Sequence, residues 1–139
     1  MYNVKREFWF SAAHRVEGHP KCGRLHGHNY KVEVTLESAT LNGDGMVMDF
    51  GLLDEIAKPI IDGMDHRYLV SRANYKAGDP YALIAEGNSD AYVLDCEQST
   101  AEELANYILN RLSGMLLWPT ARLQVTVQET PRNTATYEG

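Results

Sequence analysis

Three histidines carry the strongest chemical signal in the sequence. His14 ends an apolar stripe of period two, and His26 and His28 begin another. Side chains two residues apart on a strand share a face, so pairing of the two strands would bring three imidazoles together. Zinc binds neutral imidazole nitrogen, and three protein ligands leave the open fourth position that catalytic zinc requires. The spacing therefore predicts a zinc site, although an isolated H-x-H pair is more often an ordinary surface or core feature.

Glu129 and Cys22 are further candidates, each with two interpretations. Glu129 falls on the apolar parity of a predicted strand, where a buried carboxylate is costly unless it is paired. It either turns to solvent at the strand end or anchors a ligand through two parallel N–H bonds, such as a pterin ring offers. Cys22 precedes His26 by four residues and is either a fourth zinc ligand or a reactive thiol. Sequence spacing does not separate these alternatives.

Asp65 and His66 follow the first predicted helix. A histidine is the usual acid–base group at neutral pH, but the pattern alone favours an ordinary surface residue here. Two cysteines, Cys22 and Cys96, are expected to be reduced thiols rather than a disulfide.

Composition limits the class of protein. The chain has 139 residues, which suits a single domain over residues 1–139, with 44% apolar and 23% charged residues. A net charge of −6 argues against a basic nucleic-acid surface, and no apolar run has the length of a membrane span. The first ten residues lack the apolar core of a signal peptide, so we expect a cytoplasmic protein that binds neither nucleic acid nor membrane.

The elements that would position these residues follow from periodicity. Alternation predicts strands over 2–14, 25–37 and 121–130, with a short last strand that includes Ala135 and Tyr137. Asp49 is expected to cap a helix with the stripe Leu52, Ile56, Ile60 and Met64, in which Pro59 is expected to cause a kink or an early end. A T-x-x-E capping box at Thr100 begins a second helix, which is expected to end at Trp118-Pro119. Its predicted apolar face consists of Leu104, Ala105, Ile108, Leu112 and Met115.

The segment 71–98 shows no sustained period and is expected to be a long loop, with a short strand at Ala91–Leu94. The predicted order is ββααββ, an α+β fold in which antiparallel strands carry the histidines.

Taken together, the sequence resembles the 6-pyruvoyl-tetrahydropterin synthase / 6-carboxytetrahydropterin synthase family. The matching segments run in family order and reach nearly end to end: FSAAHR at 10–15, CGRLHGHNY at 22–30, GMVMDF at 45–50, MDHRYL at 64–69, STAEELA at 99–105 and ET at 129–130. The sequence departs from the family pattern at Val70, at 98–103 and in the length of 71–98. These departures affect the expected pocket rim and substrate preference, not the zinc site.

The resemblance implies a T-fold (tunnelling fold) subunit, an antiparallel sheet with two helices packed on one face. Such subunits commonly form a homohexamer, a dimer of trimers, with active sites between subunits. His14, His26 and His28 match the family's zinc ligands, so Zn²⁺ is the implied cofactor. Cys22 matches the catalytic cysteine.

The remaining matches complete the implied site. Asp65 and His66 match the other catalytic residues, supplied from a neighbouring subunit. Glu129 matches the pterin anchor, and Thr100 matches a residue of the pterin pocket. These matches displace the surface interpretations of His66 and Glu129.

The implied substrate is the small molecule 7,8-dihydroneopterin triphosphate. The C-x-x-x-H-G-H spacing resembles the bacterial, queuosine-pathway branch, which releases 6-carboxytetrahydropterin, acetaldehyde and triphosphate. Zinc would lower the pKa of side-chain hydroxyls, Cys22 would take a carbon-bound proton, and His66 would move protons on oxygen. Three alternatives stay open: a 6-pyruvoyl-tetrahydropterin synthase, which eliminates triphosphate; a non-catalytic zinc- or pterin-binding protein; and a zinc hydrolase, for which no H-E-x-x-H helix is present.

Overall fold

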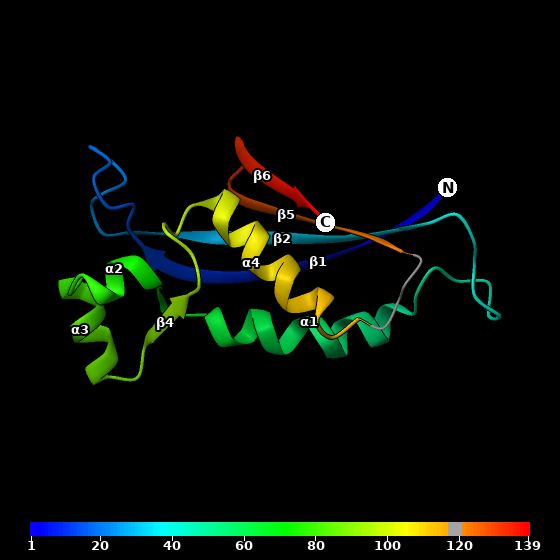
Figure 1. Ribbon diagram of the computed structural model, residues 1–139, viewed down its shortest axis with the longest axis horizontal. Coiled ribbons are helices and arrows are strands. Elements are labelled where there is room, and N and C mark those ends of the chain that lie inside the picture. The colour runs from blue at the N-terminus through cyan, green and yellow to red at the C-terminus, as the bar shows by residue number, and fades with distance from the viewer. Residues whose placement is uncertain (117–120) are drawn as a thin grey trace.

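The computed structural model describes residues 1–116 and 121–139. Two long helices lie along a curved sheet, and the shorter elements α2, α3 and β4 gather at one end of it (Figure 1). The elements in chain order are β1 (Tyr2–His14), β2 (His26–Ser38), α1 (Phe50–Met64), β3 (Tyr68–Ser71), α2 (Arg72–Lys76), α3 (Pro80–Gly87), β4 (Ala91–Leu94), α4 (Ala101–Ser113), β5 (Arg122–Thr130) and β6 (Asn133–Glu138).

The sheet has the strand order β4-β3-β1-β2-β5-β6. The four long strands pair antiparallel, whereas β3 pairs parallel with both β1 and β4. The α+β class and the predicted long strands are thus confirmed. The order ββααββ lacks the four short elements that lie between α1 and α4, and the sheet is mixed rather than wholly antiparallel.

Alternation along the strands separates the core from the outer face of the sheet. Phe8, Phe10 and Ala12 of β1 are buried with Tyr30, Val32 and Val34 of β2, whereas Trp9 is exposed. Leu123, Val125 and Val127 of β5 continue the same buried surface. This surface packs beneath α1 and α4, whose buried side chains complete one core. A period of two in the sequence therefore decides which residues are buried.

Helix α1 begins as predicted, and its predicted stripe is buried at Ile60 and Met64 but not at Leu52. Asp49 caps it by accepting hydrogen bonds from the backbone N–H groups of Gly51 and Leu52. Leu52 is nevertheless exposed, and the buried residues are Leu53, Ala57, Ile60, Ile61 and Met64. Pro59 neither ends nor shortens the helix. It lies on the exposed side, where water can replace the missing backbone hydrogen bond.

Helix α4 begins at the predicted cap. Thr100 Oγ1 accepts from the backbone N–H of Glu103 at 3.3 Å, and the predicted apolar face is buried through Leu112. The helix ends at Ser113, so Met115 lies beyond it and is exposed. The helix end expected at Trp118-Pro119 lies outside the described residues.

The segment 71–98 is not a long loop. It contains α2, α3 and β4, of which only β4 was expected. Helix α2 is capped by Ser71, whose Oγ accepts from Asn74 N at 3.1 Å. Helix α3 is capped by Asp79 and has Pro80 in its first turn. Helices this short bury few side chains, so no helical period is visible in the sequence.

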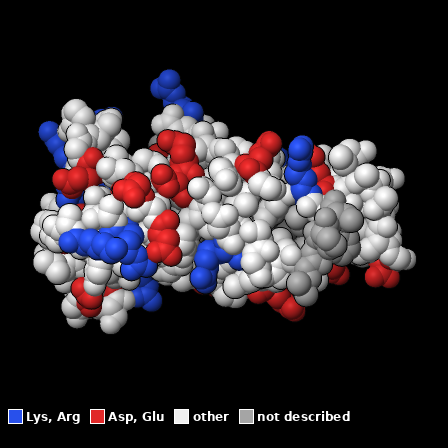
Figure 2. All heavy atoms as spheres, in the orientation of Figure 1, with Lys and Arg blue, Asp and Glu red and all other residues white. Residues whose placement is uncertain are grey.

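The surface carries both signs of charge. On the face drawn in Figure 2, Lys and Arg side chains lie among Asp and Glu side chains. Within the described ranges, no helix combines the length and apolar character needed to cross a membrane.

Candidate active site

The antiparallel register of β1 and β2 brings the three predicted metal ligands together. His14 pairs directly with His26, and Ala12 pairs with His28. The candidate ligand atoms of the three histidines lie within 4.8 Å of one another. Gly27 separates the two histidines of β2 where β1 approaches closely, because a Cβ at this position would lie 3.0 Å from Ala12 O. The H-G-H spacing thus fits both the metal geometry and the strand packing.

Backbone carbonyls orient two of the rings. His14 Nδ1 lies 2.7 Å from the carbonyl oxygen of Ser99, and His26 Nδ1 lies 2.6 Å from that of Arg24. A carbonyl can only accept, so each Nδ1 carries the proton and each Nε2 keeps its lone pair. In the described part of the chain, the buried His14 Nε2 has no hydrogen-bond partner. A buried acceptor without a partner is costly, and a metal ion would satisfy it.

Burial favours the neutral form of two of these rings. Burial, assisted by the neighbouring His26 and His28, lowers the pKa of His14 to about 4. Burial also lowers the pKa of His28, again assisted by His26. Metals bind the neutral form of imidazole, so little proton competition is expected at pH 7. Three imidazoles fit a transition-metal ion of the zinc type.

A cavity of about 600 Å³ opens beside the histidines. Its wall includes Cys22, Thr100 and Glu129 together with the three histidines. Residues far apart in the sequence therefore meet here: the loop after β1, the first turn of α4 and the end of β5. A cavity of this volume suits a small organic ligand.

Glu129 lies within this cavity rather than turning to bulk solvent. Its Oε1 lies 4.0 Å from His14 Nε2, and 21% of its side chain is exposed. Burial raises the pKa of the Glu129 carboxyl, and the nearby Glu102 raises it further. The strand parity that makes Val125 and Val127 core residues also aims Glu129 inward, at the point where the core gives way to the cavity.

Cys22 lies on a tight loop and is half-buried. Its N–H donates to His19 Nδ1 at 2.9 Å, and its carbonyl accepts from Val16 N at 2.7 Å. Gly23 next to it is required by space, since a Cβ there would lie 2.4 Å from His19 O. Among the described residues, the cluster of candidate ligand atoms comprises the three histidines without Cys22. Cys22 and Cys96 are both free thiols.

Asp65 and His66 lie elsewhere in the single chain. Asp65 Oδ1 lies 2.9 Å from His66 Nδ1 and also accepts from Ser11 N at 2.9 Å. The hydrogen bond from Ser11 lowers the pKa of Asp65, and His66 lowers it further. His66 is 81% exposed and lines a second cavity of about 520 Å³, which His28 also lines. Of the residues that the structure describes, neither Asp65 nor His66 lines the cavity of Cys22.

Several residues around the site gave no functional signal in the sequence. Ser99 holds His14 through its backbone carbonyl, which every residue type possesses. Lys21 and Arg24 line the cavity and add positive charge to it. Their nearness to Cys22 and His26 in the sequence is the signal that could have identified them.

Comparisons with known proteins agree with this geometry. The sequence model of the family described as 6-pyruvoyl tetrahydropterin synthase matches residues 3–139. A 6-carboxy-5,6,7,8-tetrahydropterin synthase of Haemophilus influenzae is 37% identical, over 86% of this chain and 94% of that relative. A putative 6-carboxy-5,6,7,8-tetrahydropterin synthase of Pyrococcus horikoshii is 33% identical, over 96% of this chain and 90% of that relative.

Solved structures agree as well. A catalytic-residue mutant (E37A) of Plasmodium vivax 6-pyruvoyltetrahydropterin synthase superposes with a TM-score of 0.80 at 25% identity, covering 99% of this chain and 97% of that one. The Caenorhabditis elegans 6-pyruvoyl tetrahydropterin synthase gives a TM-score of 0.73 at 28% identity, covering 99% and 95%. The architecture is therefore that of the T-fold pterin synthases, as the sequence predicted. The chain belongs to the 6-pyruvoyl tetrahydropterin synthase family.

Proposed function

We propose that this chain is a zinc-dependent 6-carboxy-5,6,7,8-tetrahydropterin synthase of queuosine biosynthesis, a lyase that acts in the cytoplasm. It converts 7,8-dihydroneopterin triphosphate and water to 6-carboxytetrahydropterin, acetaldehyde and triphosphate. The observation that carries the proposal is the cluster of three histidines, with the unpartnered Nε2 of His14, in a cavity shared with Cys22 and Glu129. The names of the Haemophilus and Pyrococcus relatives favour this product.

His14, His26 and His28 would hold the metal. A bound zinc ion supplies Lewis acidity, which lowers the pKa of substrate hydroxyls. The contacts from Ser99 O to His14 and from Arg24 O to His26 fix the two rings, so their Nε2 atoms are oriented before any ligand arrives.

Glu129 would bind the pterin ring. As a carboxylate it accepts two parallel N–H bonds from the ring N–H and the exocyclic amine, in the manner of an Arg–carboxylate pair. Thr100, at the first turn of α4, lines the same cavity and would contact the ring. Lys21 and Arg24 offer the positive charge that the triphosphate requires.

Cys22 would act as the base on carbon. Its thiolate would take a proton from the side-chain carbon next to the ring, which starts the redistribution that yields a tetrahydropterin with a side-chain carbonyl. Triphosphate then leaves by elimination across the two outer side-chain carbons, and water adds to the carbonyl next to the ring. Cleavage of the carbon–carbon bond beside that carbonyl leaves a carboxylate on the ring and releases acetaldehyde.

Asp65 and His66 would come from a neighbouring subunit of a homohexamer. Asp65 accepts from His66 Nδ1, which leaves Nε2 free to move protons on substrate oxygen. The separation of His66 from the Cys22 cavity within one chain supports a site shared between subunits.

Product analysis tests the proposal. Zinc-loaded protein is incubated with 7,8-dihydroneopterin triphosphate without a reductant, and the products are identified by mass spectrometry, with acetaldehyde trapped as a hydrazone. We expect 6-carboxytetrahydropterin and acetaldehyde in equal amounts, and neither with Cys22→Ala. A wild-type protein that consumes no substrate would refute the proposal and leave a non-catalytic pterin- or zinc-binding role.

The second candidate is 6-pyruvoyl-tetrahydropterin synthase activity, in which triphosphate is eliminated without loss of acetaldehyde. The names of the Plasmodium and Caenorhabditis proteins favour it. Formation of 6-pyruvoyltetrahydropterin without acetaldehyde would establish this alternative.

A further inference from the structure

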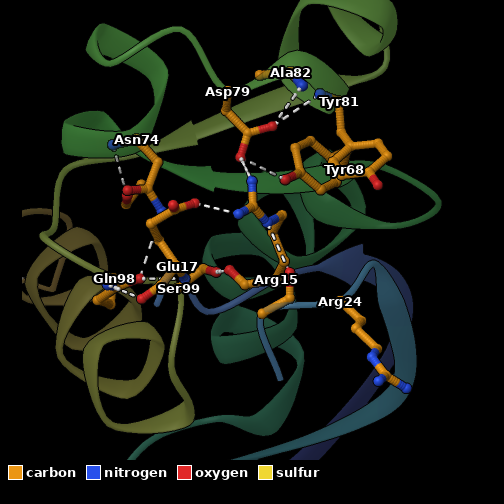
Figure 3. Close-up of polar contacts among 12 residues, drawn as sticks. Arg15, Glu17, Arg24, Tyr68, Asn74, Asp79, Tyr81, Ala82, Gln98 and Ser99 are labelled. Carbon is orange, nitrogen blue, oxygen red and sulfur yellow. Dashed lines mark hydrogen bonds and ion pairs between the residues drawn. The ribbon is translucent and has the colours of Figure 1, made fainter. Parts of the chain in front are cut away.

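Arg15 connects the loop that carries Cys22 to a distant part of the chain (Figure 3). The loop leaves β1 after His14 and returns at His26. Arg15 Nε donates to Gly23 O at 2.9 Å, directly beside Cys22. Its Nη1 donates to Asp79 Oδ2 at 3.2 Å, and its Nη2 donates to Glu17. One guanidinium therefore contacts both ends of the loop and the start of α3.

Asp79 is a fixed acceptor. Its side chain is 1% exposed. Oδ1 caps α3 by accepting from Tyr81 N at 2.9 Å and Ala82 N at 3.1 Å, while Oδ2 accepts from Tyr68 OH at 3.0 Å as well as from Arg15. The Arg15 guanidinium also lies 5.8 Å from the centre of the Tyr81 ring. Contacts with α3 and with Tyr68 of β3 thus fix the orientation of the Asp79 carboxylate independently of Arg15.

The opposite side of the loop is held by the residues before α4. The Gln98 side chain accepts from Glu17 N at 3.2 Å and donates to Glu17 O at 3.1 Å. Ser99 Oγ donates to Arg15 O at 3.0 Å, and the Ser99 carbonyl accepts from His14. These contacts secure the start of the loop, whereas the contact of Arg15 with Gly23 O reaches the part beside Cys22.

We propose that Arg15 is a positioning residue that, anchored on Asp79, holds the Cys22 loop against the α2–α3 unit. This rests on the proposed function in that Cys22 is taken as the catalytic thiol. A thiol on a loop must be held within a fraction of an ångström to act on one carbon atom. A buried ion pair adds little net stability, because both charges lose their hydration, so the role that we assign to this pair is to fix geometry. The helices that the sequence did not predict in segment 71–98 then have a role, because α3 positions Asp79.

The test uses variants that separate charge from shape. Asp79→Asn keeps a capping oxygen for Tyr81 N and Ala82 N but removes the charge that faces Arg15. Arg15→Gln removes the guanidinium, and Arg15→Lys keeps the charge without the fork of donors. The matched control is Asp95→Asn, which removes the ion pair between Arg72 and Asp95 (2.7 Å) in the same region without touching the loop.

Four quantities are measured on each full-length, zinc-loaded variant, at a temperature well below its unfolding midpoint. They are zinc content, the rate of Cys22 alkylation by iodoacetamide from peptide mass spectrometry, and kcat and KM for 7,8-dihydroneopterin triphosphate. For Asp79→Asn and Arg15→Gln we expect normal zinc content, alkylation about 5-fold faster because the loop opens more often, and a kcat lower by about 10- to 100-fold with KM changed less than about twofold.

The remaining variants test whether Arg15 and Asp79 act through the same contact. Arg15→Lys should recover part of the lost kcat, and the double variant Arg15→Gln/Asp79→Asn should be no worse than Arg15→Gln alone, because both changes break one contact. Asp95→Asn should match the wild type. Unchanged alkylation and kcat in Asp79→Asn, or an equal loss in Asp95→Asn, would overturn the proposal. If the wild type turns over no pterin, the proposed function fails, whereas the alkylation rates still decide whether Arg15 and Asp79 hold the loop.

Discussion

Replacement of Glu129 by Gln tests the most specific part of the proposed binding mode. The two side chains have nearly the same shape, but Gln offers one acceptor oxygen and an amide N–H₂ in place of two acceptor oxygens. A pterin edge presents two N–H donors, so one of them would face another donor. Because Glu129 lies in the cavity wall beside the histidines, neither group can turn away without losing its position.

The expected loss of affinity follows from the burial of this group. A buried polar group left without its partner costs about 1–3 kcal/mol. Since 21% of the Glu129 side chain remains exposed, water relieves part of the mismatch, and we expect the lower part of that range. A loss of about 1–2 kcal/mol corresponds to a dissociation constant about 5- to 30-fold higher.

Isothermal titration of zinc-loaded protein with 7,8-dihydroneopterin measures this difference without turnover of the triphosphate. Glu102→Gln is the matched control, because Glu102 lines the same cavity and carries the same charge but is exposed. We expect its affinity to change by less than about twofold. An unchanged affinity in Glu129→Gln would refute the contact. An equal loss in both variants would mean that the cavity's net charge, not a direct bond, attracts the ligand.

The other predictions concern the metal, the thiol and the assembly. Wild-type protein should carry about one zinc per chain by elemental analysis; His28→Ala should lose most of it, whereas His66→Ala should keep it. Cys22→Ala should also keep its zinc while losing turnover, and zinc loss would instead make Cys22 a ligand. In the wild type at pH 8, Cys22 should be alkylated well before Cys96, because burial raises the pKa of Cys96 to about 12. The alkylation rate of Cys96 should therefore keep rising as the pH is raised toward 12. Mixing Cys22→Ala with His66→Ala subunits should restore activity after demonstrated subunit exchange, and no recovery would place both residues in one chain's site.

The histidine cluster could be predicted because strand geometry has so few degrees of freedom. A side-chain period of two places His14 on the same face as Phe10, and places His26 and His28 with Tyr30. Antiparallel pairing of neighbouring strands then leaves only the register to be found. The inward direction of Glu129 follows from the same rule applied to β5. Sequence patterns determine such features because each depends on one element or one pair of elements.

Other features depend on tertiary contacts that the patterns do not contain. Helices of five and eight residues, as α2 and α3 are, have too few turns to show a period, although Asp79-Pro80 is a recognisable helix start. The stripe from Leu52 to Met64 repeats every four residues and therefore drifts around the helix, so packing against the sheet selected Leu53 instead of Leu52. The hydrogen bond between His14 Nδ1 and Ser99 O could not be predicted, because every residue type has a backbone carbonyl.

The backbone conformation of His66 bears on why His66 and Cys22 line different cavities. His66 has φ of 61°, a conformation that non-glycine residues seldom adopt. It is held there by its N–H, which donates to Ser11 O at 2.6 Å, while Asp65 accepts from Ser11 N at 2.9 Å. Two contacts with β1 thus maintain an uncommon conformation in order to present a solvent-exposed ring. Backbone conformations of this kind cluster at functional sites. The exposed imidazole of His66, in a chain whose Cys22 lines a different cavity, thus agrees with the proposed site shared between subunits, which the subunit-mixing experiment tests.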